Sequence, residues 1–239
     1  MANKNLITAA FKGALTDYYY LLNKNYPEKE TLKLVGDRFR LTGVQRTLLF
    51  RGITSKENAL KRISKLIPLE NSKGKILYID GYNVLFTMMN YLLGKTIFIG
   101  NDGILRDPGA AYGKIENQKT FYQSADLLVN FIPKGDLEEV TIYLDSPVSN
   151  SSSHINALEK KIRQKKIRAE THLVQSVDRR LKQINNGVIA TSDSEIIDQT
   201  PVKILDLARK ILETTYRISI LDLGTLIVDF KSTVTPSKK

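Results

Sequence analysis

The residues of this 239-residue chain that could do chemistry are aspartates at the ends of short apolar runs. The run KILYID ends in Asp80, and VTIYLD ends in Asp145. Asp178 follows THLVQ by three residues, and Asp193 lies just past GVIA. Because the carboxyl ends of parallel strands lie along one edge of a sheet, we expect these four carboxylates to meet in one crevice.

Carboxylates that meet in this way repel one another, by about 4 kcal/mol for two charges about 4 Å apart at an effective dielectric near 20. A proton on one member, a Lys or Arg among them, or a divalent cation relieves the repulsion. Oxygen-only ligands favour Mg²⁺ or Mn²⁺ over zinc. Such ions activate water and stabilise charge on a phosphate, so the pattern indicates phosphodiester hydrolysis.

Helix capping is the alternative explanation for an aspartate that follows a strand. The segment Ser192-Asp193-Ser194-Glu195 has the spacing of a capping box. Four acids at successive strand ends nevertheless favour a shared site.

Composition excludes several other chemistries. The chain has no Cys, which removes disulfides, thiolate nucleophiles and Cys-ligated zinc. His154 and His172 are its only histidines, and we expect both to have ordinary structural roles. No apolar run is long enough to cross a bilayer, and residues 1–25 lack the order of a signal peptide. We therefore expect a cytoplasmic protein whose chemistry rests on carboxylates.

The positive charge is concentrated at the front of the chain. The formal net charge is +11, and residues 1–70 carry 13 Lys and Arg against 6 Asp and Glu. A basic surface gains affinity for a polyanion by releasing counterions. A second basic run follows residue 159, for which a solvated helix face is the alternative reading. The candidate phosphate-binding residues are Arg38, Arg40, Arg46 and Arg51 in the front segment and Lys160, Lys161, Arg163, Lys165, Lys166 and Arg168 in the second run.

The first 70 residues predict a small all-α domain. Apolar residues recur at helical spacing from Leu6 to Leu22, and a second helix spans Glu28 to Val35. Thr42 and Ser55 are expected to cap a third and a fourth helix, the last one ending before Pro68. Residues 69–75 resemble a linker.

From residue 75 to residue 231, short β-rich runs alternate with helical patterns, which indicates an α/β domain with a mainly parallel central sheet. Between Thr96 and Arg106 we expect a hairpin that turns at Asn101-Asp102-Gly103, and residues 232–239 form an expected tail. The expected strands are 76–79, 139–144, 171–175, 188–190, and 218–221 with 226–228, and the expected helices are 82–93, 112–131, 152–167, 177–184 and 201–214.

The α/β segment resembles the PIN-like nucleases, and the NYN branch most closely. IDGYN is similar to the D-G-x-N element of that branch, IYLDSP to its second acidic strand end, SVDRRL to its V-D-x-x-L helix start, and ATSDSEI to its T/S-x-D element. The resemblance implies a PIN-like fold in which the acids bind Mg²⁺ or Mn²⁺ and carry out catalysis. The implied metal-binding and catalytic residues are Asp80, Asp145, Asp178 and Asp193, supported by Asn83, Thr191 and Ser192.

The whole chain also resembles an uncharacterised, mainly archaeal family that joins a short basic helical domain of unknown function to a PIN-like domain. Residues 37–53, 106–113 and 144–152 carry this likeness. Residues 96–113 interrupt the usual course from first to second strand. Asp107 and Arg106 in that insertion are therefore further candidates for the site, unless the segment is a lid or a turn.

These observations together predict a divalent-metal-dependent endoribonuclease. Its expected partner is RNA (tRNA, rRNA or mRNA), with the ribosome as a second candidate and no membrane. RNA is preferred over DNA only through the family resemblance. The alternative is a catalytically inactive RNA-binding or ribosome-associated protein with the same fold, which the basic front segment favours.

Overall fold

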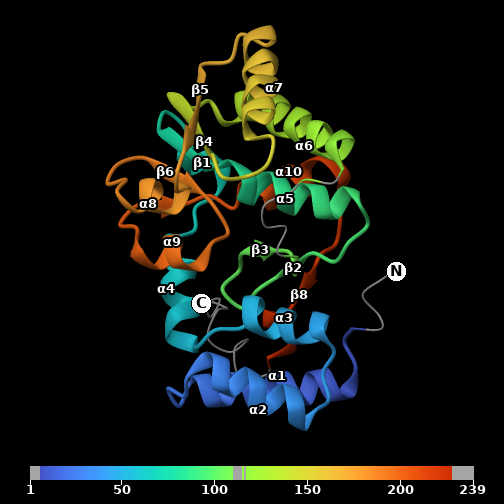
Figure 1. Ribbon diagram of the computed structural model, residues 1–239. Coiled ribbons are helices and arrows are strands. Elements are labelled where there is room, and N and C mark those ends of the chain that lie inside the picture. Colours follow the sequence, from blue (N-terminus) through green and yellow to red (C-terminus); the bar gives the residue numbers. More distant parts are fainter. Residues whose placement is uncertain (1–5, 110–114, 116, 228–239) are drawn as a thin grey trace. The chain divides into compact units, whose positions relative to one another are not determined.

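The computed structural model describes residues 6–109, 115 and 117–227, and these form two compact units (Figure 1). Of the described residues, the first unit contains 6–64, 95–108 and 219–227. The second contains 65–94, 109, 115 and 117–218. An all-helical region therefore precedes an α/β unit, as predicted, but residues 95–108 and the segment after 218 belong with the helices.

Four helices begin the chain. The first and third start at threonine caps: the Thr8 side chain accepts from the backbone N–H of Phe11, and Thr42 forms a capping box with Gln45, as its position predicts. Phe11 and Leu15 lie in the core that these helices share. The helices are α1 (Ala9–Leu22), α2 (Glu28–Arg38), α3 (Gly43–Gly52) and α4 (Lys56–Lys65).

A small sheet completes the first unit. The predicted hairpin is present as β2 (Phe98–Ile99) and β3 (Leu105–Arg106), and β8 (Leu221–Asp222) pairs with β2 in parallel. The expected last strand of the large sheet is therefore wrong, because residues 221–222 pair with the hairpin and Gly224–Leu226 forms a 3₁₀ turn. Val228 and the expected tail lie outside the described residues.

A buried ion network fixes the hairpin turn to the helices. Both oxygens of Asp102 accept from Arg106, at 2.6 and 2.7 Å, and Arg62 of α4 donates to the Asp102 carboxylate at 3.1 Å. Burial by itself would raise the pKa of Asp102, but the two guanidinium groups outweigh it and hold that pKa below its ordinary value. The carboxylate therefore stays charged and neutralises two buried cations.

We expect Asp102→Asn to lower the free energy of unfolding by about 3–5 kcal/mol, because it leaves two buried guanidinium groups without a counter-charge. The matched control is Asp37→Asn, which removes an exposed partner of Arg46 and should cost less than about 1 kcal/mol. Urea unfolding of the full chain measures both. Equal losses for the two variants would show that the network does not stabilise the first unit.

The second unit contains a five-stranded parallel sheet of order β5-β4-β1-β6-β7, which confirms the predicted α/β class. With β4 on one side of β1 and β6 on the other, the chain reverses its strand order at β1, the place where such sheets form a ligand crevice. The strands are β1 (Ile76–Asp80), β4 (Glu139–Asp145), β5 (Ala169–Val174), β6 (Val188–Ala190) and β7 (Lys203–Ile204).

The helices of this unit follow the predicted order, with three differences. The helix expected over 112–131 starts at Gln118, and the helix Ser194–Gln199 is unpredicted. The helix expected over 201–214 starts only at Leu207, because Lys203 and Ile204 pair with β6 as an unpredicted edge strand. No described helix has the length and apolar character needed to cross a membrane. The helices are α5 (Gly81–Leu92), α6 (Gln118–Phe131), α7 (Ser151–Gln164), α8 (Val177–Lys182), α9 (Ser194–Gln199) and α10 (Leu207–Tyr216).

Candidate functional site

All four predicted aspartates lie at the carboxyl end of the parallel sheet. Asp80 and Asp145 are the last residues of the neighbouring strands β1 and β4. Asp178 lies in the first turn of α8, and Asp193 is the N-cap of α9, three residues after β6. The strand ends therefore bring together four segments that are far apart in the sequence.

Hydrogen bonds join the first of these segments to the fourth. The Thr191 hydroxyl donates to Asp80 Oδ2 at 2.8 Å. The backbone N–H and the hydroxyl of Ser192 both donate to Asn83 Oδ1, at 2.8 and 2.9 Å. All three predicted supporting residues thus hold the Asp80 segment against the Asp193 segment, across more than a hundred residues of sequence.

A further hydrogen bond joins the second segment to the third. The backbone N–H of Val177, at the start of α8, donates to Asp145 Oδ1 at 3.0 Å. This bond orients the Asp145 carboxylate and places Asp178, the next residue, at the same end of the sheet. In functional sites such as metal centres, hydrogen bonds of this kind hold the carboxylates in a fixed orientation.

Position 81, directly after Asp80, requires a glycine because the start of α5 lies very close to β4. A Cβ at position 81 would lie 2.7 Å from the backbone oxygen of Tyr143 and 2.5 Å from the Leu144 side chain. Only glycine lets α5 begin this close to β4. The glycine thereby keeps Asp80 next to the end of β4, where Asp145 lies.

The capping interpretation is also correct for two of the acids. Asp80 Oδ1 accepts weakly from the N–H of Asn83 at 3.4 Å, and Asp193 Oδ1 accepts from Glu195 and Ile196 at 2.8 and 3.1 Å. Among the described residues, the second oxygens of Asp145 and Asp193 have no hydrogen-bond partner. Capping therefore orients these acids and still leaves oxygens for a ligand.

The charges of the four acids act on one another. Burial raises the pKa of Asp80 to about 8, the Thr191 hydrogen bond opposes the rise, and Asp193, Asp178 and Asp145 add to it. Desolvation, followed by Asp193 and Asp145, also raises the pKa of Asp178. The four acids therefore interact electrostatically, whereas their role as a metal site stays a prediction.

One lysine partly offsets this negative charge. Lys182 of α8 opposes the rise in the pKa of Asp178, but its ammonium also pairs with Glu195. It does not contribute to the shift of Asp80. The lysine therefore leaves most of the repulsion in place, and hard oxygen donors with unrelieved negative charge suit Mg²⁺ or Mn²⁺.

The side chains do not form a closed metal cage. Within the described part of the chain, no three His, Asp or Glu side chains lie close enough together to make a ready metal-binding group. His154 is fully buried, with its ring nitrogens 3.0 Å from the Tyr82 hydroxyl and 3.1 Å from Gln118 Oε1, and burial lowers its pKa. It lies in the interior as a neutral core residue.

The insertion candidates belong to the first unit and not to the unit that carries the four acids. Arg106 is engaged by Asp102, and Asp107 is also buried. The hairpin that carries Asp107 packs with the helices of the first unit, and a supporting role of Asp107 at the acidic site stays a prediction. Residues 110–113 of the RDPGAAYG segment lie outside the described residues.

The predicted phosphate-binding residues differ in their exposure and in their ion pairs. In the first unit, Arg46 is held by Asp37 and by the Leu41 carbonyl, and Arg38 pairs with Asp17. Arg40 is exposed, and Arg51 is half-buried. In the second unit Lys161 pairs with Asp126, whereas five others are exposed around the end of α7: Lys160, Arg163, Lys165, Lys166 and Arg168.

Two tyrosines beside the acids are absent from the predicted site. Tyr78 lies two residues before Asp80, and Tyr143 two residues before Asp145. The period of two in a strand places each tyrosine on the same face as its aspartate. The repeated Tyr-x-Asp ending of two strands is a sequence signal that could have identified them.

The fold and the site define an α/β protein with aspartates at the carboxyl end of its parallel sheet and a helical region before it. Residues 69–210 match the family described as "Domain of unknown function (DUF5616)", and residues 10–65 match "Protein of unknown function (DUF434)". The chain belongs to the DUF5616 family.

The chain is also similar to a protein of Methanocaldococcus jannaschii described as "Uncharacterized protein MJ0935", with 32% identity over 201 residues. The alignment covers 84% of this chain and 95% of that protein, so the likeness spans both units. No solved structure gives a significant match.

The raised pKa of Asp80 predicts a pH dependence of stability. A carboxyl that titrates near pH 8 when folded and near pH 4 when unfolded favours folding at low pH, and this contribution is lost as the pH rises from about 4 to about 8. In EDTA, the melting temperature should therefore fall over this range. Asp80→Asn mimics the neutral acid, and it should flatten the slope and melt higher than wild type at pH 8. If the melting temperatures of wild type and Asp80→Asn change equally with pH, the raised pKa of Asp80 is refuted.

Proposed function

We propose that the protein is a divalent-metal-dependent endoribonuclease with a PIN-like fold, acting in the cytoplasm. The observation that carries the proposal is that hydrogen bonds join the four acidic segments in two pairs, Thr191–Asp80 and Ser192–Asn83 in one and Val177–Asp145 in the other, at the carboxyl ends of the paired strands β1 and β4. Aspartates that merely capped helices would need none of these bonds between segments. RNA is preferred to DNA because of the resemblance to the NYN branch.

The residues that would hold the metal are Asp80, Asp145, Asp178 and Asp193. A bound Mg²⁺ or Mn²⁺ supplies activation of water and stabilisation of charge on the phosphate. Mg²⁺ keeps several of its waters and usually takes only one or two carboxylates directly. A site without three convergent acids is therefore compatible with this ion.

The chain's own residues would orient the site and the substrate. Thr191 and Ser192 hold Asp80 and Asn83 in place, so that little rearrangement is needed when substrate binds. The exposed cations at the end of α7, among them Lys160 and Arg168, are placed to contact phosphates without reading sequence.

A catalytically inactive RNA-binding or ribosome-associated protein is the second candidate. It is favoured by the absence of a three-acid metal group among the described residues and by exposed basic residues such as Arg40. This function predicts RNA binding that weakens with salt and that survives loss of the aspartates. It also predicts no cleavage by any form of the protein.

The test is cleavage of single-stranded and structured RNAs by the purified full chain in Mn²⁺. We expect wild type to cleave at least one RNA, and Asp80→Asn to reduce the rate by about 100-fold or more without lowering the melting temperature. The matched control is Asp136→Asn. Asp136 is an exposed partner of Lys73 with a positive φ that asparagine tolerates, so its loss should leave the rate unchanged.

Equal cleavage by wild type and Asp80→Asn would identify a contaminating nuclease and end the proposal. RNA binding by both proteins without cleavage of any RNA in the panel would favour the inactive alternative.

A further inference from the structure

A row of aromatic rings crosses the parallel sheet next to the acids. The rings of Tyr78 on β1 and Tyr143 on β4 are nearly parallel, at 8°, with centroids 6.5 Å apart. The ring of His172 on β5 lies 5.7 Å from Tyr143, at 33°. The guanidinium of Arg180, on α8, lies 5.9 Å from the centroid of the Tyr143 ring.

The strand register places this row beside the acidic site. Tyr143 is the register partner of Asp80 on one side and of His172 on the other. Residues paired in register point to the same face of a sheet, so the three side chains share a face. The row therefore leads from the acids to the edge strand of the sheet.

This face of the sheet is only partly covered. The other face packs against α7, where the Thr171 hydroxyl donates to Glu159. On the aromatic face the six-residue helix α8 supplies Arg180. Tyr143 is buried beneath this arginine and Tyr78 is half-buried, whereas 46% of the His172 side chain is exposed. Exposure is thus greatest at β5, the edge strand.

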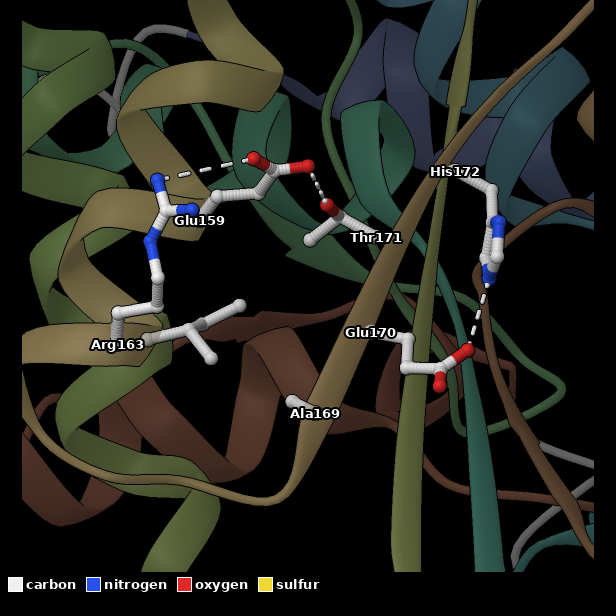
Figure 2. Close-up of a pocket in the computed structure, with 7 residues that line it drawn as sticks. Glu159, Arg163, Ala169, Glu170, Thr171 and His172 are labelled. Carbon is white, nitrogen blue, oxygen red and sulfur yellow. Dashed lines mark hydrogen bonds and ion pairs between the residues drawn. The ribbon is translucent and has the colours of Figure 1, made fainter.

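A hollow of about 350 Å³ continues the row at β5, the edge strand. Figure 2 shows Glu170 and His172 extending toward each other on one side of the strand, with Thr171 and Glu159 meeting on the other side. The hollow is lined by Glu159, Ile162, Arg163, Ala169, Glu170, Thr171 and His172.

The charge around the row suits a polyanion. Arg180 is exposed on α8, and 74% of the Arg163 side chain is exposed at the hollow. Apart from the four aspartates at one end of the row, the nearby acids are Glu170, 3.3 Å from His172, and Glu159, 3.9 Å from Arg163, and each of these two faces a basic partner. Flat rings combined with exposed guanidinium groups are the chemistry that binds unpaired bases and their phosphates.

We infer that Tyr78, Tyr143, His172 and Arg180 form a platform on which unpaired bases of single-stranded RNA stack next to the acidic site. This inference rests on RNA being the substrate. Stacking would use the exposed faces of His172 and Arg180, and the hollow along β5 would receive the adjoining nucleotide. A peptide that adds a strand to the free edge of β5 would need backbone hydrogen bonds only, and it would leave the aromatic row unused.

The experiment measures binding of a fluorescent twelve-nucleotide single-stranded RNA to the full chain in EDTA, where metal-dependent cleavage is off. His172→Ala and Arg180→Gln change exposed side chains, so both variants should fold. Each should weaken binding about fivefold to a hundredfold, the range that corresponds to the loss of one stacked base. The matched control Arg179→Gln removes the same charge from the same helix and should change affinity by no more than about twofold.

Two further probes report on stacking itself. Wild type should quench 2-aminopurine placed in the RNA, and the two variants should lose this quenching. An oligonucleotide with abasic sites should bind wild type as weakly as the intact RNA binds the variants. Unchanged affinity and quenching in both variants, or full affinity for the abasic oligonucleotide, would overturn the platform. Binding of a poly-glutamate peptide that the variants lose, with RNA affinity unchanged, would assign the row to a protein partner instead.

The outcomes separate this inference from the proposed nuclease. Stacking in EDTA without cleavage in Mn²⁺ would support the platform and refute the nuclease. Cleavage in Mn²⁺ by wild type, with unchanged RNA binding and cleavage in both variants, would support the nuclease and refute the platform.

Discussion

Repulsion among four carboxylates is the constraint on which the second unit depends. The parallel sheet delivers Asp80 and Asp145 from adjacent strands, and the helices that follow β5 and β6 add Asp178 and Asp193. Without a cation, burial first and the neighbouring carboxylates second raise the pKa of Asp80 to about 8, so Asp80 is protonated at neutral pH. Thr191 and Lys182 offset only part of the negative charge. Clustered carboxylates lower the stability of the fold, and a positively charged ligand would offset this cost.

The first unit also contains a buried carboxylate, but arginine side chains of the same unit neutralise it. Asp102 lies at the turn of the hairpin that interrupts the α/β segment, and it is neutralised in place by Arg62 and Arg106. Gly52 lets the end of α3 approach the rings and methyls of the small sheet, because a Cβ there would lie 2.7 Å from Phe98 and 2.6 Å from Leu223. The insertion thus completes the fold of the helical unit.

Sequence patterns identified most of the second unit because its central strands are apolar runs and two of them end in acids. The β1 and β4 runs, with Asp80 and Asp145, were predictable for this reason. The two-residue strands β7 and β8 were not, since pairing partners distant in sequence define them and no local period marks them. The assignment of the hairpin to the first unit was not predicted, because the sequence does not show to which unit a hairpin packs. The aromatic row went unnoticed because His172 joins it only through strand register.

Titration calorimetry with Mn²⁺ tests the central claim most directly, because it asks whether the acidic crevice binds a hard cation at all. Wild type and the Asp136→Asn control should bind Mn²⁺ at a defined stoichiometry and gain melting temperature as the ion is added. Asp80→Asn should lose both effects. Absence of site-specific Mn²⁺ uptake by wild type, or the same uptake by Asp80→Asn, would contradict the account.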